Sequence, residues 1–144
     1  EEIEALEKAG VPVEVVPGVT SAQGAAARLK ISLTHRDHAR RLQFITAHDR
    51  HGKLPPDIDW SAIADPAATT IVYMPKRTLA ELASVAMANG MPGDMPAVAI
   101  GDATRPGQIV LRGTISTIAE TLEVHPISGP VLIGIGRVFE AVKA

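Results

Sequence analysis

A cluster of basic side chains is the first feature of this sequence that could bind a charged ligand. Residues 33–41 read Leu-Thr-His-Arg-Asp-His-Ala-Arg-Arg and hold three arginines and two histidines. A guanidinium can donate two parallel hydrogen bonds to a carboxylate, which lysine cannot match. Charged runs also often face only water, so residues 33–41 fit a carboxylate-binding loop and a solvated loop equally well.

A glycine turn followed by two hydroxyl residues is a second candidate. The segment Pro17-Gly18-Val19-Thr20-Ser21 follows a β-branched run and precedes a stretch of small residues. Hydroxyl groups and free backbone N–H groups at the start of a helix can bind a carboxylate or a phosphate. An ordinary helix cap has the same pattern, and the residues alone favour that role.

Two further candidates follow predicted strands. Tyr73-Met74-Pro75-Lys76-Arg77 ends an apolar run, where a methionine more often fills a core than contacts a ligand. Residues 101–106, Gly-Asp-Ala-Thr-Arg-Pro, form a turn of small residues in which the backbone could approach a ligand closely. A plain hairpin connection explains this composition as well.

Metal sites and several common catalytic classes are not indicated. His35 with His38, and His48 with His51, have a spacing of three, which is a weak metal signal without a nearby carboxylate. The sequence has no cysteine and contains no Gly-Lys-Ser/Thr phosphate loop, Gly-x-Gly-x-x-Gly, Gly-x-Ser-x-Gly or His-Glu-x-x-His motif. We therefore expect no metal, and the residues alone predict a small domain with an anion-binding cleft.

The elements that must position these candidates alternate along the chain. Amphipathic segments predict helices within 1–9 and at 22–29, near 59, 79–88 and 115–122. Apolar, β-branched runs predict strands at 13–16, 42–46, 69–74, 97–100, 108–112 and 131–135, and residues 48–59 are expected to form a mobile loop. The alternation predicts an α/β fold with a mixed, mostly parallel sheet flanked by helices. Ligands bind such sheets beyond the carboxyl ends of the strands, where we expect the candidates to gather.

Length and charge bound the remaining possibilities. The chain has 144 residues, 46% of them hydrophobic, which suits one domain. Its net charge of −2 argues against a nucleic-acid-binding surface. No apolar run approaches the ~20 residues that a membrane span needs. We expect neither nucleic acid nor membrane as a partner, and a cytoplasmic location.

Several blocks of the sequence, in order, resemble the C-terminal half of the tetrapyrrole methylase family, and in particular its uroporphyrinogen-III C-methyltransferases. The resemblance spans essentially the whole chain. The blocks that carry it are residues 1–6, 10–21, 33–37, 59–60, 72–74 and 95–100. We therefore expect residues 1–144 to form the C-terminal α/β domain of the tetrapyrrole methylase fold, with the N-terminal domain absent from this chain.

The resemblance implies an activity and a set of site residues. The family transfers methyl groups from S-adenosyl-L-methionine to C2 and C7 of uroporphyrinogen III, giving precorrin-2 and S-adenosyl-L-homocysteine on the way to cobalamin or sirohaem. The cofactor-binding residues implied are Thr20, Ser21, Met74, Ala103, Thr104 and Val131, and the tetrapyrrole-binding residues implied are Glu1, Arg36 and Met74. Arg40, Arg41, Lys76 and Arg77 are further candidates for the substrate carboxylates. Family members are usually homodimers, which predicts self-association.

The sequence departs from the family pattern in ways that limit these expectations. The family's glycine-rich loops and its proposed acid/base residue precede the matched region, so no catalytic residue is assigned here and the isolated chain is expected to be inactive. Met74-Pro75 stands where many relatives have Met-Gly, and Asp102-Ala103-Thr104 where many have Asn-Gly-Thr. Two alternatives remain: a non-catalytic anion-binding or assembly module, and a tetrapyrrole methylase with a different substrate.

Overall fold

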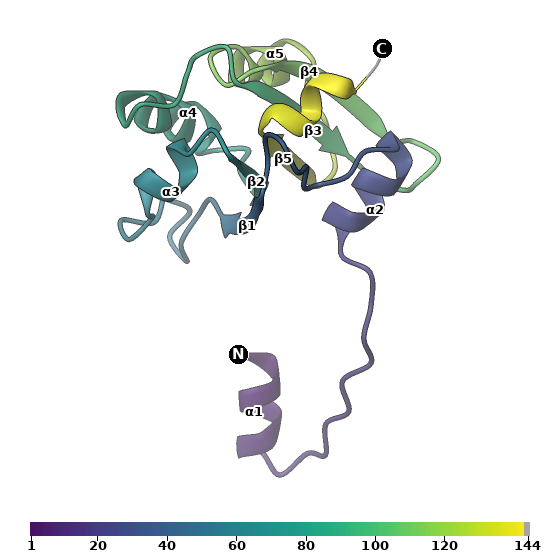
Figure 1. The fold of residues 1–144 in the computed structure, drawn as a ribbon. Helices are drawn as coiled ribbons and strands as arrows, with labels where there is room; N and C mark the ends of the chain where they lie inside the picture. The colour runs from purple at the N-terminus through teal and green to yellow at the C-terminus, as the bar shows by residue number, and fades with distance from the viewer. Residues whose placement is uncertain (143–144) are drawn as a thin grey trace.

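Short helices and strands alternate along most of the chain, and a computed structural model describes residues 1–142 of it (Figure 1). In chain order the elements are α1 (Glu2–Lys8), α2 (Ser21–Leu29), β1 (Arg41–Thr46), α3 (Trp60–Ala64), β2 (Ala68–Tyr73), α4 (Leu79–Ala88), β3 (Pro96–Gly101), β4 (Ile109–Thr114), α5 (Ile118–Val124), β5 (Val131–Ile135) and the 3₁₀ helix η1 (Arg137–Ala141).

The five strands form one sheet in the order β1-β2-β5-β3-β4. β1 and β2 pair in parallel, with Arg41 opposite Ala68 and Thr46 opposite Tyr73. The other three pairings, β2 with β5, β5 with β3 and β3 with β4, are antiparallel. The last strand of the chain therefore lies in the middle of the sheet.

The predicted α/β class with a mixed sheet and flanking helices is confirmed, but the prediction that the sheet is mostly parallel is wrong. β1, β2 and β3, which α3 and α4 connect, do run in the same direction, as alternating strands and helices imply. β5, however, inserts antiparallel between β2 and β3, and β4 returns from β3 as a hairpin. Only one of the four strand pairings is consequently parallel.

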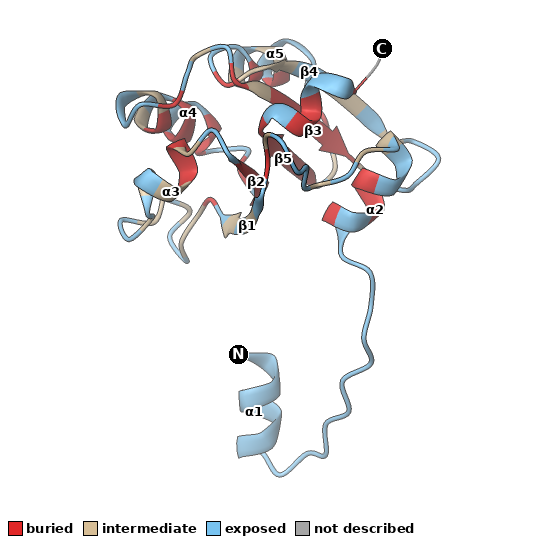
Figure 2. Cartoon of the chain, viewed as in Figure 1, coloured by how far each residue is buried: buried red, intermediate tan, exposed pale blue. Residues whose placement is uncertain are grey.

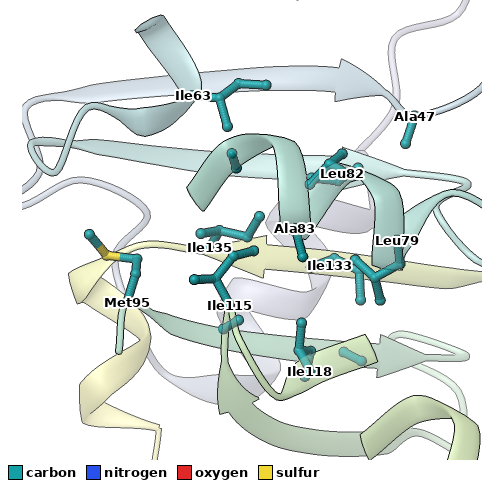
Figure 3. Close-up of a cluster of buried hydrophobic side chains, with 14 of the residues drawn as sticks. Ala47, Ile63, Leu79, Leu82, Ala83, Met95, Ile115, Ile118, Ile133 and Ile135 are labelled. Atoms are coloured by element: carbon teal, nitrogen blue, oxygen red, sulfur yellow. The ribbon is translucent and has the colours of Figure 1, made fainter. Parts of the chain in front are cut away.

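Helices cover the sheet on both faces because its central strands are apolar on both sides. On one face, Ile133 and Ile135 of β5 pack with Leu82 of α4, Ile118 of α5 and Ile63 of α3 (Figure 3). On the other face, a second cluster joins α2, the middle strands and η1; its members include Ala22, Ala25, Ile71, Val98, Leu132 and Phe139. Burial is accordingly concentrated in the sheet and on the helix sides that face it (Figure 2).

The first twenty residues do not join this core. α1 and the extended segment after it are exposed throughout and stretch away from the sheet (Figures 1 and 2). The predicted strand at 13–16 is wrong for this reason: β-branched residues favour extended backbone, but a strand also needs a pairing partner, and residues 11–20 have none. Val16 and Val19 remain 79% and 83% exposed.

Two smaller features complete the fold. The helix predicted at 115–122 begins only at Ile118, because the N–H of Thr117 bonds to the carbonyl of Thr114 in a turn that follows β4. Within residues 1–142, no helix has the length and apolar character that crossing a membrane requires.

Candidate functional site

A cavity of about 810 Å³ opens at one end of the sheet, where β1, β2 and β3 finish and β5 begins. Five segments line it. They are the start of α2 with Ser21, the loop 48–52 after β1, the end of β2 with Tyr73, Met74, Lys76 and Arg77, the end of β3 with Ile100, Asp102, Ala103 and Arg105, and residues 130–132 at the start of β5. Its floor is apolar, formed by residues such as Ile100 and Leu132, and its walls carry most of the charge.

Four of the six residues predicted to bind the cofactor line this cavity: Ser21, Met74, Ala103 and Val131. The other two lie next to it. Thr20 is the N-cap of α2, and its side chain accepts a hydrogen bond from the N–H of Gln23. Thr104 packs its methyl group against Gly24 of α2, and its N–H donates to Oε1 of Gln108 at 2.8 Å. Thr20 therefore confirms the helix cap predicted for residues 17–21, and the contact of Ser21 with a ligand stays a prediction.

The predicted tetrapyrrole-binding residues are placed less uniformly. Met74 lines the cavity and is 56% exposed. Glu1 begins the exposed N-terminal segment, far from the sheet (Figure 1). Arg36 lies in an exposed turn closed by the bridge between His35 and Ala39, and it is not among the cavity residues. The structure therefore brings only Met74 of these three residues to the cavity.

The rest of the basic segment 33–41 also lies outside the cavity. His35 and His38 stack with ring centroids 4.0 Å apart and line a separate hollow of about 430 Å³ with Lys30 and Arg137. Arg41 forms an ion pair with Asp65. Within residues 1–142, no group of three or more His, Cys, Asp or Glu side chains is arranged to hold a metal ion.

Non-glycine residues in left-handed backbone conformations follow two of the strands that end at the cavity. Met74 has φ 53° after β2, and Asp102 and Thr104 have φ 47° and 71° after β3. Side chains other than glycine are disfavoured there, and such strain is concentrated at functional sites. Asp102 is also one of the positions where the sequence departs from the family pattern, and Pro75 and Ala103, the other two, are each next to one of these residues. The turn at Met74 is braced by a contact of 3.1 Å between its carbonyl and Nδ1 of His48.

The charge of the cavity wall differs in sign from that of the chain. Arg50, Lys76, Arg77 and Arg105 line it against two carboxylates, Asp49 and Asp102, whereas the whole chain has a net charge of −2. The prediction that Lys76 and Arg77 could meet an anionic substrate therefore has a geometric basis. Arg105 was predicted only as part of the candidate turn 101–106, and Arg50 was not predicted. The sequence signal for Arg50 was the run His48-Asp49-Arg50-His51, which had been assigned to a mobile loop.

That loop is ordered by its own hydrogen bonds. The carboxylate of Asp49 accepts from the N–H of His51 at 2.7 Å and of Lys53 at 3.0 Å. The backbone of Asp49 also bonds to Lys53 and to Gly52, whose φ of 74° closes the turn. The hydrogen bond from the backbone of Lys53 is the main cause that lowers the pKa of Asp49 below its usual value, followed by that from His51. The loop thus has a fixed shape before any ligand binds.

Comparison with known proteins places the chain in a family. The family model for Tetrapyrrole (Corrin/Porphyrin) Methylases matches residues 1–119. A uroporphyrinogen-III C-methyltransferase of Paracoccus denitrificans is 41% identical over 138 residues, which are 96% of this chain and 48% of that protein. A siroheme synthase of Gluconacetobacter diazotrophicus is 42% identical over 139 residues, 96% of this chain and 29% of that protein. The chain therefore spans half the length or less of these relatives.

Solved structures agree with the sequence comparison. A uroporphyrin-III C-methyltransferase of Thermus thermophilus in complex with S-adenosyl homocysteine has a TM-score of 0.79 and 27% identity, covering 96% of this chain and 59% of that one. A cobalt precorrin-4 methyltransferase shares the fold, with a TM-score of 0.81 at 24% identity over 99% of this chain and 58% of that one. With a family match over residues 1–119 and relatives of this similarity, the chain belongs to the tetrapyrrole (corrin/porphyrin) methylase family.

Proposed function

We propose that this chain is part of an S-adenosyl-L-methionine-dependent methyltransferase that converts uroporphyrinogen III to precorrin-2 by methylation at C2 and C7. The observation that carries the proposal is the cavity at the end of the sheet, which four of the predicted cofactor residues line. Its combination of an apolar floor and a cationic wall suits a macrocycle of four pyrrole rings whose edge bears eight carboxylates.

The residues present also fit the methyl donor. The hydroxyl of Ser21 and the N–H of Ala103 have no hydrogen-bond partner within residues 1–142, so both are available to the polar groups of a nucleoside or an amino acid. Met74 and Val131 both contribute apolar surface to the cavity lining. The donor supplies a methyl group on a positively charged sulfur, and S-adenosyl-L-homocysteine is the product that remains.

Positioning is the contribution that these residues make to methyl transfer. The left-handed turn at Met74, whose carbonyl contacts His48, sets the backbone position from which the methionine side chain enters the cavity. A side chain at this position limits how far the donor and the tetrapyrrole can move relative to each other, and alignment of two reactants contributes a large part of many rate enhancements. No acid or base is assigned to this chain.

The proposal assigns the complete activity to a longer protein. Residues 1–144 are proposed to form the C-terminal domain, and the relatives are about twice as long or more. The exposed valines of the N-terminal segment support a role for residues 1–20 in contacts with further protein, either the N-terminal domain or a second copy in a homodimer. A cytoplasmic location is part of the same proposal.

A methyl-transfer assay tests this function. The chain, alone and joined to the N-terminal half of the Paracoccus denitrificans relative, is incubated with uroporphyrinogen III and S-adenosyl-L-methionine labelled in the methyl group. We expect label in the tetrapyrrole only with the joined protein. Methylation by the isolated chain would contradict the division of the site between two domains, and no methylation by the joined protein would contradict the activity.

A variant pair assigns the activity to the cavity. Met74→Ala in the joined protein should lower the rate by roughly tenfold or more, since it removes a side chain that positions both reactants. Val124→Ala is the matched control, because Val124 is an apolar residue on α5 that is also more than half exposed and lies outside the cavity. Activity on a different tetrapyrrole, with uroporphyrinogen III left unchanged, would favour the alternative substrate.

A further inference from the structure

The cations of the cavity wall are not equivalent, and the difference points to a substrate-selecting feature. Nζ of Lys76 donates to the carbonyl of Ile127, and Arg105 lies 3.9 Å from the carboxylate of Asp102. Arg50 and Arg77 form no ion pair within residues 1–142. Of the four cations, these two guanidiniums are therefore the ones available to an anionic ligand.

Arg50 and Arg77 lie on the same side of the cavity mouth. A Cβ atom added at Gly52 would come within 3.9 Å of Nη1 of Arg77, so this guanidinium rests against the loop that carries Arg50. The two arginines come from different strand ends, the loop after β1 and the turn after β2. They are held together where Ala47 donates its N–H to the carbonyl of Tyr73 at 3.0 Å and accepts from Oγ1 of Thr78 at 2.6 Å.

The acidic residue nearest in sequence does not neutralise this pair. The carboxylate of Asp49 is directed at the backbone N–H groups of its own loop, where two hydrogen bonds hold it. Arg50 is oriented by a contact of 3.3 Å between its Nε and Nε2 of His51, which leaves its terminal N–H groups for a ligand. Two guanidiniums on a preformed loop and an adjacent turn suit a ligand that presents two neighbouring carboxylates.

We propose that Arg50 and Arg77 each bind one of the two carboxylate side chains of a single pyrrole ring, and that they thereby select the tetrapyrrole by the number of carboxylates on its edge. This inference rests on the proposed function and specifies which residues distinguish one tetrapyrrole from another. A macrocycle with two carboxylates on every ring engages both arginines at once. A macrocycle with one carboxylate per ring leaves one arginine without a partner.

Binding of two porphyrins tests the selection. The probes are uroporphyrin III, with eight carboxylates, and coproporphyrin III, with four, titrated with the 144-residue chain and followed by porphyrin fluorescence anisotropy. We expect the chain to bind uroporphyrin III roughly tenfold more tightly or better. Each of Arg50→Gln and Arg77→Gln should lower this ratio by roughly threefold to fivefold, which is the upper part of the range for exposed ion pairs.

The control variants separate recognition from charge. Lys53→Gln removes the same charge from the same loop, but Lys53 does not line the cavity, so it should leave the ratio within about twofold. Arg50→Lys keeps the charge but loses the planar guanidinium that can donate two parallel hydrogen bonds, so its binding ratio should lie between those of wild type and Arg50→Gln. An unchanged ratio in both arginine variants, an equal loss in Lys53→Gln, or a wild-type chain that fails to prefer uroporphyrin III would each overturn the inference.

Failure of this inference is distinguishable from failure of the proposed function. If the joined protein methylates uroporphyrinogen III while the porphyrin ratio is insensitive to Arg50 and Arg77, only the selection is wrong. If the joined protein transfers no methyl group, the proposed function is wrong whatever the ratio.

Discussion

Gly134, in the middle of β5, provides a sharp test of the fold that builds the cavity. It pairs with Ile71 of β2 on one side and Val98 of β3 on the other, and the ring of Phe139 from η1 lies directly over it. A Cβ atom at this position would be 2.2 Å, 2.6 Å and 2.7 Å from three carbons of that ring. The substitution Gly134→Ala therefore forces the ring or the strand to move.

The size of the effect follows from these distances. Carbon atoms in van der Waals contact are about 3.5–4.0 Å apart, so the ring must withdraw by more than about 1 Å. Phe139 is buried, and overpacking of this kind costs about 1–3 kcal/mol of unfolding free energy. Without the ring, alanine would instead stabilise a strand by about 0.5–1 kcal/mol relative to glycine. The sign of the change thus reports whether η1 covers β5.

Urea unfolding followed by far-UV circular dichroism measures this change. Gly107→Ala is the matched control, because a Cβ there meets nothing within 4 Å. Adding Phe139→Leu to Gly134→Ala removes the clashing carbons, so the double variant should lose about 1–2 kcal/mol less than the sum of the single losses. A Gly134→Ala variant that is as stable as Gly107→Ala, or more stable, would refute the position of η1 over β5.

Two further predictions concern the site and the assembly. In the protein joined to an N-terminal domain, Gly24→Ala should weaken S-adenosyl-L-homocysteine binding by roughly tenfold, because the added Cβ would lie 2.7 Å from Cγ2 of Thr104 and displace the turn beside Ala103. Adding Thr104→Ser removes that methyl group and should restore the affinity. A Gly24→Ala variant that binds like wild type would show that the contact is not needed. The isolated chain should self-associate through its exposed apolar N-terminal segment, which static light scattering measures as a mass above that of one chain. Val16→Lys should reduce the association. A monodisperse wild-type monomer would contradict this expectation.

Local patterns in the sequence predicted most individual elements. The helix at 79–88 and the strand at 131–135 have the bounds that periodicity and the flanking Gly and Pro residues indicated. The strand at 13–16 failed because pairing depends on a partner that local preference does not reveal. The place of β5 failed for a similar reason: no feature of residues 131–135 shows that they enter the sheet between β2 and β3.

Part of the candidate site could be predicted because its residues lie at the ends of predicted strands or at the start of a predicted helix. Ser21, Met74 and Ala103 belong to segments that end strands or begin a helix, so the sheet itself brings them to one edge. Arg50 was missed because its loop is shaped by side-chain-to-backbone hydrogen bonds of Asp49, which composition alone does not distinguish from a mobile segment. Arg36 lies in a tight turn outside the cavity, so its expected contact with the tetrapyrrole stays a prediction.

We propose that the cavity lined by Ser21, Met74, Ala103 and Val131 is half of a methyl-donor site. Calorimetric titration of S-adenosyl-L-homocysteine into the 144-residue chain, and into the same chain joined to the N-terminal half of the Paracoccus denitrificans relative, tests it most directly. We expect S-adenosyl-L-homocysteine to bind the joined protein, and to bind the chain alone not at all or more weakly by at least about tenfold. Equal binding to both forms, or no binding to the joined protein, would contradict it.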